Sequence, residues 1–315
     1  MAQIMGEINH WGNTLGRISV PTIFFGGGTP SLMPVETLGR IMDAIEQNFD
    51  IDAGAEITME ANPGTLDAQK ITEFHKCGIN RMSIGVQSLN DDELQFLGRR
   101  HTADMARATI DRARTSGMRV SADFIYGLPG QGPDDVIQMC RGINELGLGH
   151  CSMYELTIEP GTPFGKMGLC MPSNSAMADM YAAIGDTLTL PRYEVSNYAT
   201  PSQHCRHNEN IWDGAPYVGI GRAAAGRIFM AGHWFEQMGA GELFQELAPH
   251  ERAIERIITG MRTMRGVAVD DSVRPAINMA WVDAHPDLVI RRNGRICATN
   301  AGLMILDNVL TDMVV

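Results

Sequence analysis

The sequence has no long apolar run and no excess of basic residues, and each absence excludes a class of protein. No stretch of about 18 apolar residues occurs among the 315 residues, so no transmembrane segment is predicted. Residues 1–20 include Glu7, His10 and Arg17 and lack the apolar core of a signal peptide. Lys and Arg number 25 against 37 Asp and Glu, which gives a net charge of −12. This negative charge argues against sequence-independent binding to the phosphate backbone of nucleic acids, so no nucleic-acid partner is expected.

Paired cysteines are also absent, because no CxxC or CxxxCxxC spacing occurs anywhere in the chain. The six cysteines are scattered at Cys77, Cys140, Cys151, Cys170, Cys205 and Cys297. In a chain of this length such scatter is typical of reduced thiols in the cytosol rather than of a disulfide framework. We therefore expect a cytoplasmic protein in which the cysteines form no metal site.

The first half of the sequence repeats one pattern, a short apolar run followed by a special loop and an amphipathic helix. The apolar runs predict strands over 20–25, 56–60, 81–86, 119–125 and 151–156. The helical periodicity and the capping residues predict helices over about 34–49, 66–76, 90–97, 102–117 and 133–146. Strands that alternate with helices predict an α/β fold with a parallel sheet, either doubly wound or closed toward a barrel.

The second half is less regular. Residues 193–212 form a dense polar and aromatic stretch, and 249–265 predict a helix. An arginine-rich turn over 291–295 resembles a hairpin, and a helix is expected from Asn300. We therefore expect a small C-terminal α+β element that resembles a winged helix.

Glycine or polar residues follow the predicted strands, where the sites of barrel enzymes are found. Gly26, Gly27 and Gly28 would let backbone N–H groups approach a ligand closely, although the same residues also suit a tight strand-to-helix turn. The segment is neither a GxGxxG fingerprint nor a P-loop.

Three further polar side chains stand near strand ends, and a fourth, Arg99, follows the short helix after Gln87. Glu60 could accept two hydrogen bonds from a ribose diol, or it could be a solvated strand end. Gln87 and Asp123 stand at two other strand ends, and Arg99 could pair with a ligand carboxylate in a two-pronged contact. Each alone is more often structural. Their shared position favours a ligand with amino, carboxylate and ribose groups.

The segment 204–207 places three soft donors, His204, Cys205 and His207, within four residues. A metal or haem iron could use one of them. No second pair with ligand spacing follows, so a closed zinc site is not expected, and loop histidines are the other interpretation. We treat His150, among the remaining histidines, as incidental.

Several segments together resemble the radical-SAM family of oxygen-independent coproporphyrinogen III oxidases, and most of all its haem-chaperone branch, HemW. The resemblance covers about residues 20–315, and its motifs occur in order at 23–32, 59–63, 80–88, 97–101, 123–129, 154–162 and 193–199. It implies a partial (β/α)6 barrel over residues 1–200, with the first strand missing, and a HemW-like C-terminal region over 201–315.

The resemblance also implies binding roles for individual residues. It assigns the methionine end of S-adenosylmethionine to Gly27, Gly28 and Thr29, its polar end to Gln87 and Arg99, and its ribose to Glu60 and Asp123. Residues 207–212 look like the motif linked to haem binding in HemW, which makes His207 the candidate haem ligand. Ile211 stands where that motif usually has tyrosine.

Two departures from the family pattern matter. The family carries CxxxCxxC upstream of the glycine segment, and three thiolates there hold a [4Fe–4S] cluster; the ligands of that cluster are absent here. Without an electron donor the chain is expected to be inactive as a radical-SAM enzyme, and a gene model that starts at an internal methionine is the favoured explanation. Arg222 and Ala225 also replace the family's proline and histidine.

Three functions stay open on this basis. The first is a haem carrier that binds haem and S-adenosylmethionine and delivers haem to membrane respiratory enzymes. The second is an oxygen-independent coproporphyrinogen III oxidase of porphyrin biosynthesis. The third keeps only the binding of S-adenosylmethionine.

Overall fold

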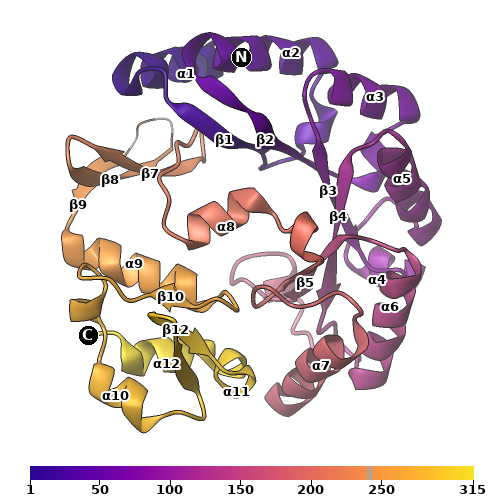
Figure 1. Ribbon diagram of the computed structural model, residues 1–315. Coiled ribbons are helices and arrows are strands. Elements are labelled where there is room, and N and C mark those ends of the chain that lie inside the picture. Colours follow the sequence, from indigo (N-terminus) through magenta and orange to yellow (C-terminus); the bar gives the residue numbers. More distant parts are fainter. Residues whose placement is uncertain (240, 242) are drawn as a thin grey trace.

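The computed structural model describes residues 1–239, 241 and 243–315, and a six-stranded sheet curls through its larger part (Figure 1). The strands lie in sequence order: β1 (Ser19–Phe25), β2 (Asp50–Ala61), β3 (Arg81–Gln87), β4 (Arg119–Tyr126), β5 (His150–Glu155) and β6 (Asn197–Ala199). The first five strands are parallel, and β6 pairs antiparallel with β5. The predicted partial (β/α) barrel is therefore confirmed.

Helices cover the outside of this curved sheet (Figure 1). They are α1 (Ala2–Leu15), α2 (Val35–Asn48), α3 (Ala68–Lys76), α4 (Asp91–Phe96), α5 (Ala103–Thr115), α6 (Pro133–Glu145) and α7 (Asn174–Thr187). The predicted helix starts are confirmed by their caps, since the side chains of Asn90 and Thr102 accept hydrogen bonds from the first turns of α4 and α5. Pro133 opens α6, as a residue without an N–H suits a first helical turn. Two helices, α1 and α7, were not predicted.

The strands of the half-barrel turn apolar side chains outward and polar side chains inward. Successive residues of a strand point to opposite faces, so the pattern can be read directly along β2. There Ile57 and Met59 join the core under the helices, whereas Thr58 and Glu60 line a cavity on the inner side. The inner side of the sheet is therefore a polar lumen, and the outer side carries the main core.

The chain then re-enters the curve of the sheet. Helix α8 (Arg206–Trp212) lies inside this curve (Figure 1) and contacts both β1 and α9 (Pro249–Met261). Strands β7 (Ala225–Met230), β8 (His233–Met238) and β9 (Leu243–Leu247) form an antiparallel sheet that the sequence did not predict.

The C-terminal part is a small α+β unit, as predicted. It contains α9, β10 (Val267–Ala268), α10 (Met279–Ala284), β11 (Val289–Arg292), β12 (Arg295–Ala298), α11 (Asn300–Met304) and α12 (Leu306–Met313). The expected hairpin joins β11 to β12 through Asn293 and Gly294, whose φ angles of 51° and 73° are typical of a tight two-residue turn. Its likeness to a winged helix stays a prediction.

Short 3₁₀ helices occupy several loops, namely η1 (Pro30–Leu32), η2 (Pro63–Thr65), η3 (Phe164–Lys166), η4 (Pro201–Gln203) and η5 (Arg274–Ala276). Three apolar clusters hold the chain together: one under the half-barrel helices, one in the C-terminal unit, and one that joins α1 and α2 to Ile228 of β7. A division near residue 200 stays a prediction. None of the helices in the described ranges combines the length and the apolar character that a membrane crossing requires.

Candidate functional site

The register of the parallel strands collects polar side chains in rows across the lumen. Glu60, Ser83 and Ser121 are successive partners on β2, β3 and β4, and His150 continues this row on β5. In the next row, Asp123 of β4 stands beside Ser152 of β5. Partners in adjacent strands lie about 5 Å apart, so side chains distant in sequence meet on one surface.

A cavity of about 140 Å³ lies at the carboxyl ends of β1 to β4. Its wall consists of Gly28, Thr29, Pro30, Glu60, Ala61, Asn62, Ser83, Gly85, Gln87 and Asp123. Five of the seven residues predicted to bind S-adenosylmethionine belong to this wall. We refer to it below as the strand-end cavity.

The glycine segment forms an open backbone turn over this cavity. Gly27 and Gly28 have φ angles of 78° and 56°, a left-handed conformation that favours glycine. The N–H of Gly27 donates to Glu60 Oε2 at 3.2 Å, and the Nδ2 of Asn62 donates to Thr29 Oγ1 at 3.4 Å. The predicted glycine segment and the predicted Glu60 carboxylate are thus in direct contact.

Gln87 reaches the cavity through an irregularity in β3. Its φ angle is 70°, and the pairing of β3 with β4 shifts register between Gly85 and Gln87. A bulge of this kind redirects a side chain, and a left-handed non-glycine residue costs on the order of 1 kcal/mol or more. A side chain at Gly85 would stand 2.7 Å from Gln87 Nε2, so glycine is needed beside it.

Asp123 is the enclosed carboxyl group of the strand-end cavity. It accepts a hydrogen bond from Ser83 Oγ at 2.9 Å. Burial raises the pKa of Asp123 above its usual range, and the nearby charge of Glu60 acts in the same direction. Asp123 and Glu60 therefore present two neighbouring carboxyl groups to the strand-end cavity.

The role assigned to Arg99 stays a prediction. Arg99 is not part of the wall of either cavity, and its Nε is buried with no hydrogen-bond partner among residues 1–239, 241 and 243–315. Burial also lowers its pKa. The residue follows the end of α4.

A larger cavity of about 310 Å³ continues from the strand-end cavity toward α8. The two share Glu60, Ser83 and Asp123. The remaining wall is formed by Phe24, Thr58, Arg81, Ser121, His150, Ser152, Tyr154, Asn197, Cys205, His207, Asn208 and Ile211. We refer to this space as the lumen cavity.

His207 projects from the first turn of α8 into this region. Its Nδ1 lies 3.2 Å from Thr22 Oγ1, and its ring stacks on Phe24 with 4.9 Å between centroids and an interplanar angle of 23°. Burial lowers the pKa of His207 below its usual value of 6.5, so the imidazole is neutral at pH 7. In the tautomer whose Nδ1–H donates to Thr22 Oγ1, the lone pair of the neutral ring lies on Nε2, which is then the atom that could bind a metal.

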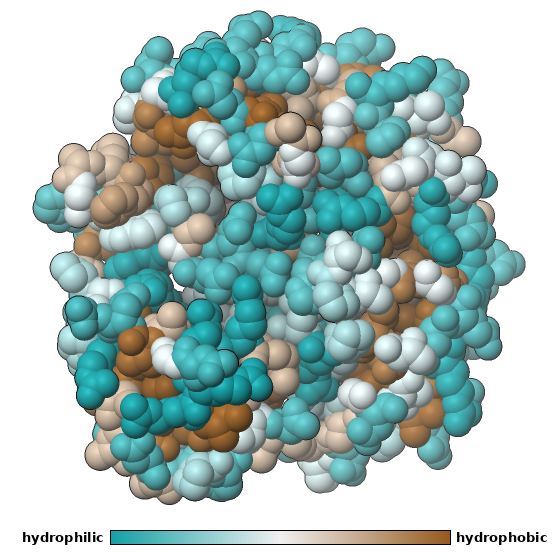
Figure 2. All heavy atoms as spheres, in the orientation of Figure 1, coloured by the Kyte–Doolittle hydropathy of each residue, from teal (hydrophilic) through white to brown (hydrophobic). Residues whose placement is uncertain are grey.

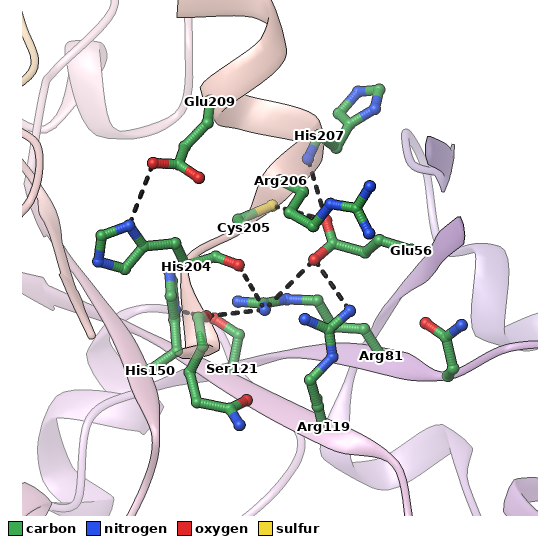
Figure 3. Close-up of polar contacts among 12 residues, drawn as sticks. Glu56, Arg81, Arg119, Ser121, His150, His204, Cys205, Arg206, His207 and Glu209 are labelled. Carbon is green, nitrogen blue, oxygen red and sulfur yellow. Dashed lines mark hydrogen bonds and ion pairs between the residues drawn. The ribbon is translucent and has the colours of Figure 1, made fainter. Parts of the chain in front are cut away.

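A buried charge cluster fixes α8 to the sheet (Figure 3). Glu56 is fully buried, and its Oε2 lies 3.1 Å from Arg119 Nη2 and 3.6 Å from Arg81 Nη1. The other oxygen, Oε1, accepts a hydrogen bond from the backbone N–H of His207 at 3.0 Å. Arg81 Nη1 also donates to the carbonyl of Gln203 at 2.9 Å. The sheet therefore holds both the approach to α8 and its first turn.

The sequence missed the inward residues below the strand ends. Glu56, Arg81 and His150 lie within strands or at their starts, and the sequence assigned none of them a binding role. His150, treated as incidental, belongs to the lumen wall, with its Nδ1 2.6 Å from Ser121 Oγ and its Nε2 2.7 Å from the Tyr193 hydroxyl. The alternation of polar with apolar residues along β2 and β3 was the available signal.

The cysteines do not fit a [4Fe–4S] cluster within the described ranges. They stand on separate elements, and no group of three or more His, Cys, Asp or Glu residues suited to a metal was found in the part of the chain that the structure describes. Cys205 is the one cysteine in the wall of the lumen cavity, and its thiol lies 3.6 Å from Glu56 Oε1.

Figure 2 shows that hydrophilic residues cover the centre of the face on which α8 lies. The curled parallel sheet, with a glycine turn and carboxylates at its strand ends, agrees with the arrangement that the radical-SAM resemblance implies. The family model of the Radical SAM superfamily matches residues 6–143.

Curated relatives make the assignment more specific. Heme chaperone HemW of Lactococcus lactis is 35% identical over 269 residues, which are 79% of this chain and 70% of that protein. Heme chaperone HemW of Escherichia coli is 39% identical over 213 residues, 66% of this chain and 56% of that protein. The chain belongs to the radical-SAM family that contains HemW and coproporphyrinogen III oxidase. It spans less than two thirds of the Escherichia coli and Haemophilus influenzae relatives.

A solved structure supports the fold. Coproporphyrinogen III oxidase (HemN) from Escherichia coli superimposes with a TM-score of 0.80 and 19% identity, covering 98% of this chain and 81% of that one. At this identity the likeness concerns the fold alone, and it extends over the half-barrel and the C-terminal unit.

Proposed function

We propose that this protein is a haem chaperone of the HemW type, which binds haem through His207 and S-adenosylmethionine in the strand-end cavity. The observation that carries the proposal is the state of His207: a neutral imidazole whose Nδ1 is engaged by Thr22, leaving Nε2 for an axial bond to haem iron. The 35–39% identity to proteins named heme chaperones supports the same function.

The surroundings of His207 suit a flat ligand at the rim of the lumen cavity. Phe24 and Ile211 are apolar members of the wall near the histidine, and Tyr154 is 42% exposed. Most of the deeper wall is polar, so an apolar macrocycle gains little by entering it. We therefore place the haem ring at the rim, with the cavity behind it.

S-adenosylmethionine fits the strand-end cavity by its donor set. The glycine turn offers backbone N–H groups to the methionine end, and Glu60 and Asp123 offer acceptors to a ribose diol. In an intact radical-SAM protein a cluster would supply the electron for cleavage of this molecule. In this chain the assigned residues bind and orient it, and Gly27 and Arg99 are the two members of the expected set that do not belong to the cavity wall.

Delivery of haem to a membrane respiratory enzyme, from the cytoplasm, completes the proposal. It rests on the family resemblance of residues 20–315, and the described residues carry no separate feature that selects a recipient.

The test is a haem titration of the purified chain followed by Soret absorbance, with His207→Ala beside it. Removal of the axial ligand is expected to weaken binding at least tenfold and to shift the Soret band. His233→Ala is the matched control, because that histidine is 58% exposed on β8 and lies outside both cavities. Equal affinity of His207→Ala and the wild type would refute the assigned ligand, and absence of saturable binding in a folded wild type would refute the function.

A further inference from the structure

We infer that the lumen cavity contains a carboxylate-binding site formed by Arg81 and Thr58. The ligand is either a small organic acid or the propionate arm of a tetrapyrrole. If the ligand is a propionate arm, the inference rests on the proposed haem function. It extends that function, because it assigns a binding site to the carboxylates of haem.

Two buried polar groups of the cavity wall have no hydrogen-bond partner among the residues that the structure describes. Arg81 is 1% exposed, and its Nη2 makes no hydrogen bond to any residue that the structure describes. Thr58 is fully buried, and its Oγ1 is likewise unpartnered within the described part of the chain. Buried donors without partners are rare and costly, which points to a molecule that occupies the cavity.

The two groups stand side by side. Thr58 of β2 and Arg81 of β3 are register partners in adjacent parallel strands, and both line the lumen cavity. One carboxylate oxygen can accept from an Nη2–H group of Arg81 while the other accepts from the Thr58 hydroxyl. A guanidinium is the cation best suited to this planar contact.

The charges around the site favour an anion at this end of the cavity. Two arginines, Arg81 and Arg119, share the single carboxylate of Glu56, so the cluster carries one excess positive charge. His150 adds no charge, because burial and the nearby arginines lower its pKa well below 6.5. The acidic groups of the wall, Glu60 and Asp123, belong to both cavities and so lie at the junction between them.

The cavity has room for such a group. Its volume of about 310 Å³ exceeds the roughly 30 Å³ share of one water molecule about tenfold and stands at the lower end of ligand pockets. His207 belongs to the same wall. A haem bound to His207 at the rim could therefore extend a propionate arm toward Arg81, which would fix the orientation of the macrocycle.

The experiment compares three probes: haem, haem dimethyl ester and sodium propionate. The ester retains the iron and the ring but lacks the carboxylates. Haem and its ester are titrated by Soret absorbance, and sodium propionate is followed by protection of the chain against thermal unfolding. We expect haem to bind at least tenfold more tightly than its ester, and Thr58→Val and Arg81→Gln to reduce this ratio at least threefold.

Two variants keep the result interpretable. Thr58→Val removes only the hydroxyl and leaves the charge cluster intact. It therefore still tests the carboxylate site if Arg81→Gln fails to fold. Arg291→Gln is the matched control, because Arg291 is more than half exposed in its pair with Asp283 and lies outside the cavity wall. This control should keep the wild-type ratio.

The outcomes separate the two claims. Equal affinity for haem and ester, with binding still dependent on His207, overturns the propionate arm and leaves the haem function standing. Absence of haem binding, with propionate protecting the wild type but not Thr58→Val, supports a site for a small free acid. If neither haem nor propionate binds the folded wild type, both claims fall.

Discussion

His207 shows how one residue can be prepared for iron by its neighbours. The hydroxyl of Thr22 engages Nδ1, Phe24 stacks on the ring, and Glu56 accepts the backbone N–H. None of these partners lies near His207 in sequence, so the sequence could nominate the histidine but could not reveal the contacts that orient it.

The state of His207 determines how haem binding depends on pH. Iron needs the neutral imidazole, and burial lowers the pKa of His207 below 6.5. Protonation therefore competes with iron only below that value. We expect the haem affinity to be constant from pH 8 to about pH 6.5 and to fall at lower pH, as measured by Soret titrations in buffers of equal ionic strength. A decline centred above pH 6.5 would contradict the buried, neutral histidine.

At the scale of residues, the sequence predicted the strand-end positions better than the lumen. Gly28, Thr29, Glu60, Gln87 and Asp123 gather as expected, because parallel strands bring their carboxyl ends to one edge. Gly27 and Arg99 are not part of this wall, and their predicted roles stay predictions. Arg81 was missed because an arginine at a strand start is usually a solvated end.

Among the elements, α8 depends most on long-range contacts. It has seven residues, too few for stability alone, and its N-cap residue Cys205 makes no side-chain cap. The Glu56 carboxylate takes over this role by accepting the N–H of His207, with Arg81 and Arg119 balancing its charge.

Removal of this carboxylate should cost the fold heavily. Glu56→Ala leaves two arginines without their partner, one of them fully enclosed, and we expect a loss of about 3–5 kcal/mol in the free energy of unfolding. Urea denaturation measures it. Asp283→Ala is the control, because its ion pair with Arg291 is more than half exposed and should contribute less than about 1 kcal/mol. Similar losses in the two variants would contradict a structural role for the buried cluster.

The predicted elements were those with strong local signals. Strands followed by glycine or polar turns, and helices with capping residues, were found from sequence alone. The sheet β7–β9 was missed because both of its faces make stabilising contacts. Phe235 and Ile228 join the apolar cluster with α1 on one face. On the other face, the guanidinium of Arg252 stacks over the ring of Trp234, 4.1 Å from its centroid. A strand held in this way has no simple alternation of apolar and polar residues.

Taken as a whole, the molecule is tied together across its sequence by the third apolar cluster. Trp11 of α1 is 6% exposed and lies 5.9 Å from the ring of Phe244 on β9. Such contacts over more than 200 residues cannot be inferred from periodicity, and they explain why α1 escaped prediction. They also connect the half-barrel to the segment that follows α8.

Trp11→Ala tests this connection. We expect a loss of about 3–5 kcal/mol in the free energy of unfolding, because removal of the indole leaves an empty space in the third apolar cluster. We also expect faster amide hydrogen exchange in β7–β9, because this space would lie against that sheet. Exchange in the C-terminal hairpin β11–β12 serves as the internal control, since it belongs to a separate cluster. Unchanged exchange in β7–β9 would show that α1 does not support this sheet.

The central claim is that His207 binds haem iron, and pulsed electron paramagnetic resonance of the ferric haem complex tests it most directly. The chain is prepared with ¹⁵N-histidine, and the hyperfine coupling of the axial nitrogen is recorded. We expect a ¹⁵N imidazole coupling in the wild type and its loss in His207→Ala at haem concentrations that still fill the site. A coupling that persists in His207→Ala, or one that is absent from the wild-type complex, would contradict the assignment.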